Sequence, residues 1–230
     1  MRNGSLQTSF APWPYAFSTP FRVCAPRSKT SAGARADGEN HVIGPAATLR
    51  DVAFTVGTAL ARAGVDAVLC GGSAATFYAP DVYQSEDLDF VLTFGAEDAV
   101  AARRALESLG YTLRNAMFFH DASHFTVEFP VGPLKIGEET VSDVDTVRRG
   151  EQSLRIIGAT AVVKDRLLKY AAWDDFSSLR AALGVARTID LDLDDVRAFM
   201  SREGAGVFEK RFDEAMRVFE RRLREEKFSE

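Results

Sequence analysis

The sequence predicts an α+β fold, in which a mixed β-sheet with flanking helices is followed by a C-terminal helical bundle. In the first two-thirds of the chain, apolar residues alternate or run together over about four to eight positions, as they do in strands. Gly and Pro separate these runs from segments with helical periodicity. After Gly158 the pattern is helical only, so the boundary between the two parts is expected near residue 159.

The domain organisation follows from composition. Of the 230 residues, 46% are hydrophobic, which is enough to bury a substantial core. We predict an α/β domain over residues 46–158 and a helical domain over 159–230. Residues 1–45 are rich in Ser, Pro, Ala and Arg without periodicity, which predicts a disordered N-terminal extension. The Arg and Ser enrichment without acidic residues is similar to that of an organellar transit peptide, although no amphipathic pattern stands out. A start codon assigned too far upstream would explain the segment equally well.

Composition also narrows the class of protein. No apolar run approaches the roughly 20 residues of a membrane span, so no membrane association is expected. The two cysteines, Cys24 and Cys70, are not expected to pair, which favours a reducing compartment and a cytoplasmic protein. The net charge is −5, and the first 36 residues contain no acidic side chain, so the remainder is more acidic still. Broad nucleic-acid binding is not expected of such a chain.

Capping and breaking residues place the elements in order. Thr48 and Asp51 resemble a helix-capping box, apolar residues then recur at helical spacing to Leu60, and Gly64 ends this first helix. The pattern predicts strands over 65–71, 86–94, 111–119 and 124–129, with two more near 140–147 and 153–158. It predicts further helices over 73–79, 96–109, 160–174, 175–187, 191–201 and 206–227.

The fold is organised around a strand that leads into a glycine turn. The apolar run ending at Cys70 is followed directly by Gly71, Gly72 and Ser73. Two glycines let the backbone turn sharply and let a ligand approach the main chain. Ser73 is expected to cap the next helix. Free N–H groups and the helix dipole would then point at a bound anion, so the turn predicts a phosphate site.

The next strand carries two carboxylates. Side chains alternate along a strand, so Asp87 and Asp89 project from one face while Leu88 and Phe90 project from the other. Two carboxylates so close together repel each other, unless a divalent cation lies between them. A phosphate cradle next to a carboxylate pair predicts a site for a metal ion and a triphosphate.

Gly71-Gly72-Ser73 followed by Asp87-Leu88-Asp89 resembles the signature of the DNA polymerase β-like nucleotidyltransferase superfamily. The resemblance implies a nucleotidyltransferase-like mixed sheet and a Mg²⁺-dependent enzyme, with two metal ions expected. Such an enzyme transfers a nucleoside monophosphate from an NTP to a hydroxyl group. The 13 residues between Ser73 and Asp87 lie towards the long end of what the family shows.

The resemblance also implies a third carboxylate, on a later strand between hydrophobic residues. Phe125, Val127 and Phe129 share one face of the strand predicted there, and Glu128 points the opposite way, as Asp89 does. We therefore expect Glu128 to complete the metal site with Asp87 and Asp89, and to act as the general base. The alternative is a solvent-facing glutamate on an edge strand.

The helix predicted after the sheet, from Val163 onwards, is similar to a segment of minimal bacterial nucleotidyltransferases related to abortive-infection toxins. That similarity implies that Lys164 contacts the phosphates and that Asp175 supports the nucleotide from further away. It also implies a tRNA or protein acceptor, and a possible antitoxin partner. The alternative for this helix is a charged outer face with Trp173 in the core.

A second interpretation of the whole chain is a catalytically inactive module of the same fold, which binds a nucleotide or a partner protein. The presence of Asp87, Asp89 and Glu128 together favours the enzyme.

Overall fold

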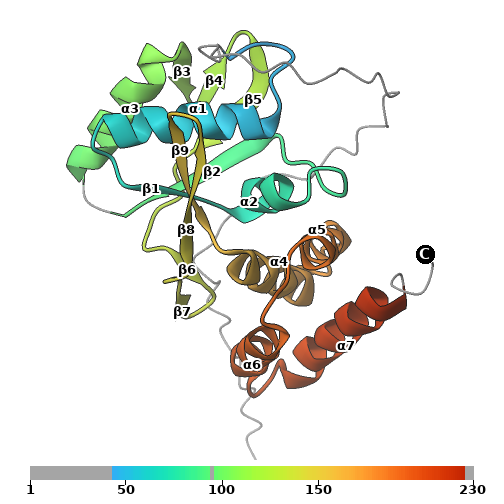
Figure 1. Ribbon diagram of the computed structural model, residues 1–230. Coiled ribbons are helices and arrows are strands. Elements are labelled where there is room, and N and C mark those ends of the chain that lie inside the picture. Colours follow the sequence, from blue (N-terminus) through green and yellow to red (C-terminus); the bar gives the residue numbers. More distant parts are fainter. Residues whose placement is uncertain (1–42, 94–95, 226–230) are drawn as a thin grey trace, which may run out of the picture. The chain divides into compact units, whose positions relative to one another are not determined.

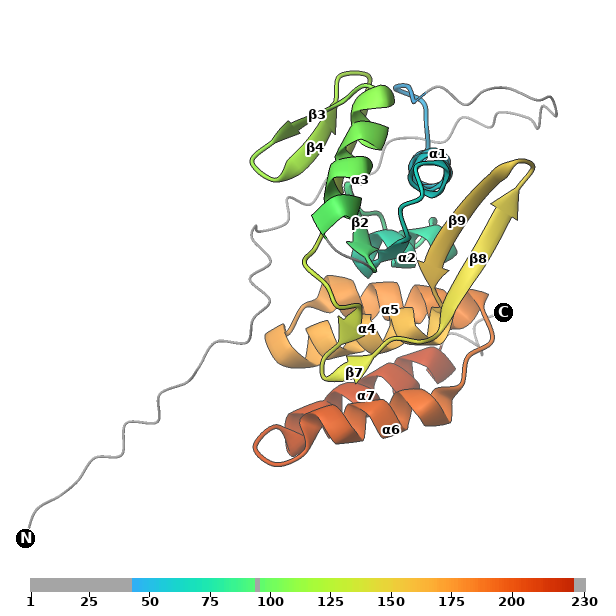
Figure 2. The same cartoon turned by 90° about the vertical axis from the view of Figure 1, so that its left-hand side faces the viewer.

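The computed structural model describes residues 43–93 and 96–225 (Figures 1 and 2). The extension predicted over residues 1–45 therefore lies outside the described residues except for its last three positions, and so does Cys24.

A mixed β-sheet is the centre of the fold, as the sequence predicted. Its strands follow the order β3-β4-β5-β2-β1-β9-β8. β2 runs antiparallel to β1 and parallel to β5, and β9 runs parallel to β1. The strands of this sheet are β1 (Ala67–Cys70), β2 (Asp87–Leu92), β3 (Tyr111–Arg114), β4 (Met117–His120), β5 (Ser123–Glu128), β8 (Val144–Arg149) and β9 (Gln152–Ile157). A separate hairpin is formed by β6 (Lys135–Ile136) and β7 (Glu139–Thr140).

Helices flank the sheet and then form the C-terminal part of the chain. α1 packs against β1, β9 and α3, and α3 packs against β3. Figure 2 shows α4 beside α5, and α6 beside α7, which agrees with their contacts. The bounds are α1 (Leu49–Arg62), α2 (Gly71–Tyr78), α3 (Ala96–Ser108), α4 (Ala159–Trp173), α5 (Phe176–Thr188), α6 (Leu193–Gly204) and α7 (Glu209–Glu225).

The first helix begins and ends as predicted. The Thr48 hydroxyl accepts from the Asp51 backbone N–H at 3.2 Å, and the Asp51 carboxylate accepts from the Thr48 backbone N–H at 3.0 Å, which completes the capping box. Gly64 follows the helix with φ of +75°, a left-handed conformation that favours glycine.

The strand predicted over residues 111–119 is in fact two strands, β3 and β4, joined by a tight turn. Asn115 and Ala116 form this turn with φ of +50° and +66°. Two consecutive residues with positive φ are typical of the two-residue hairpin turns that match strand twist. The prediction was wrong here because alanine gives no sequence signal for such a turn. The pair predicted near 140–147 and 153–158 forms the hairpin β8–β9, shifted at its first strand.

The helical part joins the α/β part through α2, which packs against α4 and α5. The described residues, 43–93 and 96–225, fall within one compact unit. The division into two domains near residue 159 stays a prediction. Among the described residues, none of the helices combines the length and apolar character needed to cross a bilayer.

Candidate active site

Strand pairing brings the three predicted carboxylates to one face of the sheet. β2 and β5 run parallel, with Asp87 opposite Thr126 and Asp89 opposite Glu128. Directly paired residues on neighbouring strands project to the same face. The intervening pair, Leu88 and Val127, points to the other face and is fully buried. We call Asp87, Asp89 and Glu128 the carboxylate cluster.

The glycine turn lies directly against this cluster. Cys70, the last residue of β1, pairs with Asp89 across the sheet, so the turn after Cys70 begins beside that carboxylate. Gly71 has φ of +64°, and a Cβ at this position would lie 2.5 Å from Asp89 Oδ2. Any larger residue at 71 would therefore strain the backbone and displace the carboxylate. The first glycine of the motif makes room for Asp89.

Ser73 has a different place from the one predicted. The N-cap of α2 is Cys70, because both glycines already belong to the first turn of the helix. The Ser73 hydroxyl is fully buried; it donates to the Cys70 carbonyl at 2.7 Å and accepts from the Asp89 backbone N–H at 3.1 Å. Ser73 thus ties α2 to both strands, and it fixes Asp89 relative to the turn.

The connection from α2 to β2 positions the other aspartate. Ser85 donates its hydroxyl to Asp87 Oδ1 at 2.6 Å. Its own backbone N–H donates to the Thr76 hydroxyl at 2.9 Å, and Thr76 in turn donates to the Gly72 carbonyl at 3.1 Å. The sequence analysis did not identify Ser85 or Thr76, because serine and threonine in a connection carry no distinctive pattern.

The electrostatics of the cluster are unfavourable for three ionised carboxylates. Burial, followed by the negative charge of Asp87, raises the pKa of Asp89 to about 7, although Arg166 opposes this shift. Burial and the charge of Asp87 also raise the pKa of Glu128. Raised carboxyl pKa values in one place are characteristic of sites that bind a cation or transfer a proton.

Arg166 on α4 is a residue of this site that the sequence analysis missed. Its side chain is buried, and Nε donates to Asp165 Oδ2 at 3.0 Å. Burial opposes its charge, but Asp165, Tyr83 and Asp89 together raise the pKa of the guanidinium above its ordinary value. Since the same guanidinium lowers the pKa of Cys70 and of Asp89, it lies within electrostatic reach of the turn and the cluster.

Lys164 lies two residues earlier and faces other partners. Its Nζ lies 2.7 Å from both Glu139 Oε1 on β7 and Asp195 Oδ2 on α6, and over the Phe199 ring. Its role as a phosphate contact stays a prediction, which competes with this structural role.

Asp175 caps helix α5. One of its oxygens accepts from the backbone N–H groups of Ser177 and Ser178, at 3.0 and 3.3 Å. It also contributes, after burial, to raising the pKa of Tyr83. The Tyr83 hydroxyl lies 3.0 Å from where a Cβ on Gly72 would be. Asp175 therefore lies within electrostatic reach of Tyr83, whose hydroxyl lies beside the glycine turn. The support of a nucleotide by Asp175 stays a prediction.

The cluster supplies the ligands that Mg²⁺ prefers, which are carboxylate oxygens. Among the described residues, no group of three Asp, Glu, His or Cys side chains is arranged so that it could hold a metal ion by itself, and this includes the three carboxylates of the cluster. Mg²⁺ usually retains waters and takes one or two carboxylates together with substrate phosphates. An open, repulsive carboxylate cluster beside a helix N-terminus fits that mode of binding, in which the triphosphate completes the coordination.

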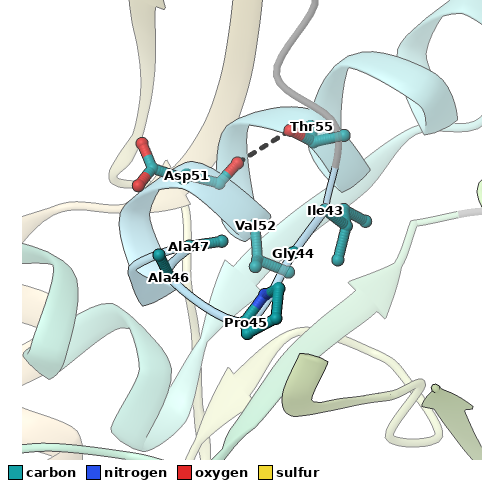
Figure 3. Close-up of a pocket in the computed structure, with 8 residues that line it drawn as sticks. All are labelled: Ile43, Gly44, Pro45, Ala46, Ala47, Asp51, Val52 and Thr55. Atoms are coloured by element: carbon teal, nitrogen blue, oxygen red, sulfur yellow. Dashed lines mark hydrogen bonds between the residues drawn. The ribbon is translucent and has the colours of Figure 1, made fainter. Parts of the chain in front are cut away.

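A separate hollow of about 280 Å³ lies at the start of α1 and is distinct from this site (Figure 3). None of its lining residues belongs to the cluster or to the glycine turn. They are Ile43, Gly44, Pro45, Ala46, Ala47, Asp51, Val52 and Thr55.

Solved structures with a similar fold include nucleotidyltransferases. A nucleotidyltransferase-like antigenic protein from Paracoccidioides brasiliensis matches with a TM-score of 0.49 and 11% identity, over 74% of this chain and 92% of that chain. The antibiotic-resistance factor ANT(2'')-Ia matches with a TM-score of 0.46 and 10% identity, over 74% and 94%. Its complex with adenylyl-2''-tobramycin matches with a TM-score of 0.36 and 16% identity, over 64% and 94%.

A scan against family models and a search of curated proteins found no match. Because every TM-score given above is below 0.5 and every identity below 25%, the function proposed next rests on this chain's own side chains.

Proposed function

We propose that this protein is a metal-dependent nucleotidyltransferase, which transfers a nucleoside monophosphate from an NTP to a hydroxyl acceptor. One observation carries the proposal: Asp89 and Glu128 are paired in register on neighbouring strands, with Asp87 two residues from Asp89, directly beside the Gly71 turn. This arrangement combines a place for phosphates with a place for cations.

Each residue has a defined task. The backbone N–H groups after Gly71 and Gly72, at the start of α2, bind the β- and γ-phosphates. Asp87 and Asp89 hold Mg²⁺, which supplies charge neutralisation for the triphosphate. The acceptor oxygen attacks the α-phosphorus, pyrophosphate leaves, and Glu128 takes the proton of the acceptor hydroxyl. The raised pKa of Glu128 makes this carboxylate a stronger base than an ordinary one.

The acceptor follows only from the resemblance to toxin-related enzymes. We propose a hydroxyl of tRNA or of a protein, and an antitoxin remains a possible partner under the same resemblance. Neither proposal is supported by a contact among the described residues.

Labelled nucleotides test the function directly. Purified protein is incubated with each ³²P-labelled NTP, Mg²⁺ and either total RNA or a cell lysate. We expect a labelled product with wild type and none with Asp87→Asn combined with Asp89→Asn. The variant with Asp121→Asn, an exposed aspartate in a turn, is the matched control and should keep full activity. NTP binding without labelled product or pyrophosphate release would support the inactive binding module instead.

A further inference from the structure

Two aromatic rings at the junction of α4 and α5 are unusually exposed. Trp173 is 58% exposed and Phe176 is 60% exposed, more than any other Trp, Tyr or Phe among the described residues. The alternative interpretation that placed Trp173 in the core is therefore wrong. Large aromatic side chains bury much apolar area when they can, so an exposed pair of this kind indicates a binding surface.

The position of Trp173 on α4 relates it to the carboxylate cluster. Trp173 follows Arg166 by seven residues, which at 3.6 residues per turn places both on the same side of the helix. The helix α4 also packs against α2, which begins at the glycine turn. Seven residues correspond to about 10 Å along the helix axis. Trp173 thus lies about two turns along α4 from Arg166, on the same side of the helix.

A second observation relates the glycine turn to the junction of α4 and α5. The Tyr83 hydroxyl packs over Gly72, and α2 itself packs against both α4 and α5. Asp175, which lies between the two exposed rings in the sequence, is close enough to Tyr83 to influence its pKa. The junction that carries the exposed rings is therefore connected, through α2 and Tyr83, to the residues around the proposed phosphate site.

The junction holds these rings in a defined geometry. Asp174 adopts a left-handed conformation with φ of +56°, and its backbone N–H donates to the Tyr170 carbonyl at 2.9 Å. Asp175 then caps α5 directly. The ring of Tyr170 lies 5.4 Å from that of Phe176. A non-glycine residue in the left-handed region has an energetic cost, and such strain is concentrated at functional sites.

We propose that Trp173 and Phe176, with Tyr170 packed against Phe176, form a stacking surface for the nucleobase of the NTP. This inference rests on the proposed function, because it assumes that the triphosphate binds at the glycine turn. With the phosphates there, the ribose and base extend along α4 towards Trp173. Every base has a flat π-face that can stack on an indole. The larger purine ring covers more of the indole, so purine nucleotides are expected to bind more tightly.

Tryptophan fluorescence tests this surface. The chain contains two tryptophans, Trp13 and Trp173, so Trp13→Phe leaves Trp173 as the only indole. Each of the four NTPs, and inorganic tripolyphosphate, is titrated into this protein with Mg²⁺. We expect NTPs to change the emission of Trp173. Tripolyphosphate should compete with NTP for binding without changing the emission.

The NTP affinities of Trp173 variants measure how much the stacking surface contributes to binding. Trp173→Ala should raise the Kd for NTP about five- to a hundredfold, the range that loss of one stacked base implies. The Kd for tripolyphosphate should stay within about twofold, because its site is not altered. Trp173→Phe should recover most of the affinity. Phe208→Ala removes another exposed ring, 44% exposed between α6 and α7, and should have no effect.

The outcomes separate the two proposals. If wild type binds NTP and Trp173→Ala binds it equally well, with unchanged emission throughout, the stacking surface is rejected and the proposed function stands. If neither NTP nor tripolyphosphate binds wild type, the proposed function is rejected and the stacking surface with it. An emission change caused by acceptor RNA but not by NTP would also overturn this inference, since the occupant would then be the acceptor.

Discussion

Helix α4 carries two buried cations whose charges are balanced in different ways. Lys164 is 5% exposed and Arg166 is 6% exposed, but two residues apart on a helix they point in nearly opposite directions. Lys164 meets two carboxylates from other elements, Glu139 and Asp195, both at 2.7 Å. Arg166 donates to Asp165 of its own helix and faces a cluster of further carboxylates.

The two cations differ in how completely the charges around them are balanced. Around Lys164 the two partly exposed carboxylates are matched by two cations, because Glu139 also pairs with Arg202, and this arrangement needs no further ion. Around Arg166 a single guanidinium is opposed by several carboxylates, and the pKa of Asp89 rises to about 7. A protein retains such an unfavourable group of charges where a bound cation relieves it. Under the proposed function, the Arg166 side of α4 is therefore the side that meets the nucleotide.

The largest expected effect is on the rate of nucleotide transfer when Glu128 is replaced. Glu128→Gln removes the proposed base but keeps its size. We expect the rate of nucleotide transfer in a single turnover to fall about 10²- to 10⁴-fold, with little change in NTP affinity. Glu151→Gln, at an exposed turn between β8 and β9, is the matched control. An unchanged rate in Glu128→Gln would remove this residue from the site.

The raised pKa of Asp89 predicts a pH dependence of stability. The folded state holds this proton up to about pH 7, whereas the unfolded chain loses it near pH 4. The resulting contribution to stability is complete below pH 4 and is lost as the pH rises to 7. It amounts to at most about 4 kcal/mol. Asp89→Asn should remove this part of the pH dependence and stabilise the metal-free protein near pH 7.5.

Urea unfolding between pH 5 and 8, without divalent cations, measures this difference between wild type and Asp89→Asn. Wild type should lose more stability than the variant over that range. Parallel curves for the two proteins would contradict the assignment of the buried, protonated carboxyl to Asp89.

The two cations of α4 should respond in opposite ways to the same substitution. Lys164→Met should lower the free energy of unfolding by about 1–3 kcal/mol, because it removes the cation beside Asp195 and leaves Glu139 with Arg202 alone, and it should leave NTP affinity unchanged. Arg166→Met should weaken NTP binding instead, since the remaining carboxylates repel the triphosphate. Binding titrations and urea unfolding on both variants provide the comparison. A larger loss of NTP affinity in Lys164→Met would restore Lys164 as the phosphate contact.

The smallest effect concerns the glycine turn. Gly71→Ala and Gly150→Ala both place a side chain at positive φ, +64° and +57°, at a cost of about 1–2 kcal/mol each. Only at position 71 does the new Cβ meet Asp89, because nothing lies within 4 Å of it at position 150. Both variants should lose similar stability, but only Gly71→Ala should also lose Mg²⁺-dependent NTP binding. Equal binding by the two would show that Asp89 tolerates displacement.

The parts of the site built on strands were predictable from the sequence. Alternation fixed the faces of Asp89 and Glu128, because Phe90 and Val127 had to point into the core. The side of α4 that faces the site was not predictable, since buried residues, both apolar and charged, lie on several faces of this helix and form no single apolar stripe. Lys164 was expected at the phosphates only because of the resemblance to toxin-related enzymes, and no pattern in the sequence singled out Arg166. The exposure of Trp173 likewise depends on how α5 turns away after Asp174.

The most direct test of the central claim is the thermal stability of the protein with and without its proposed ligands. Wild type is compared with Asp87→Ala combined with Asp89→Ala, each with NTP alone, Mg²⁺ alone and both together. At a ligand concentration of about 100 times Kd, bound NTP adds about 2.7 kcal/mol. The Tm of wild type should therefore rise by several degrees with NTP and Mg²⁺ together, and the Tm of the double variant should not change. An equal rise in the variant, or no rise in wild type, would contradict a metal–nucleotide site at these carboxylates.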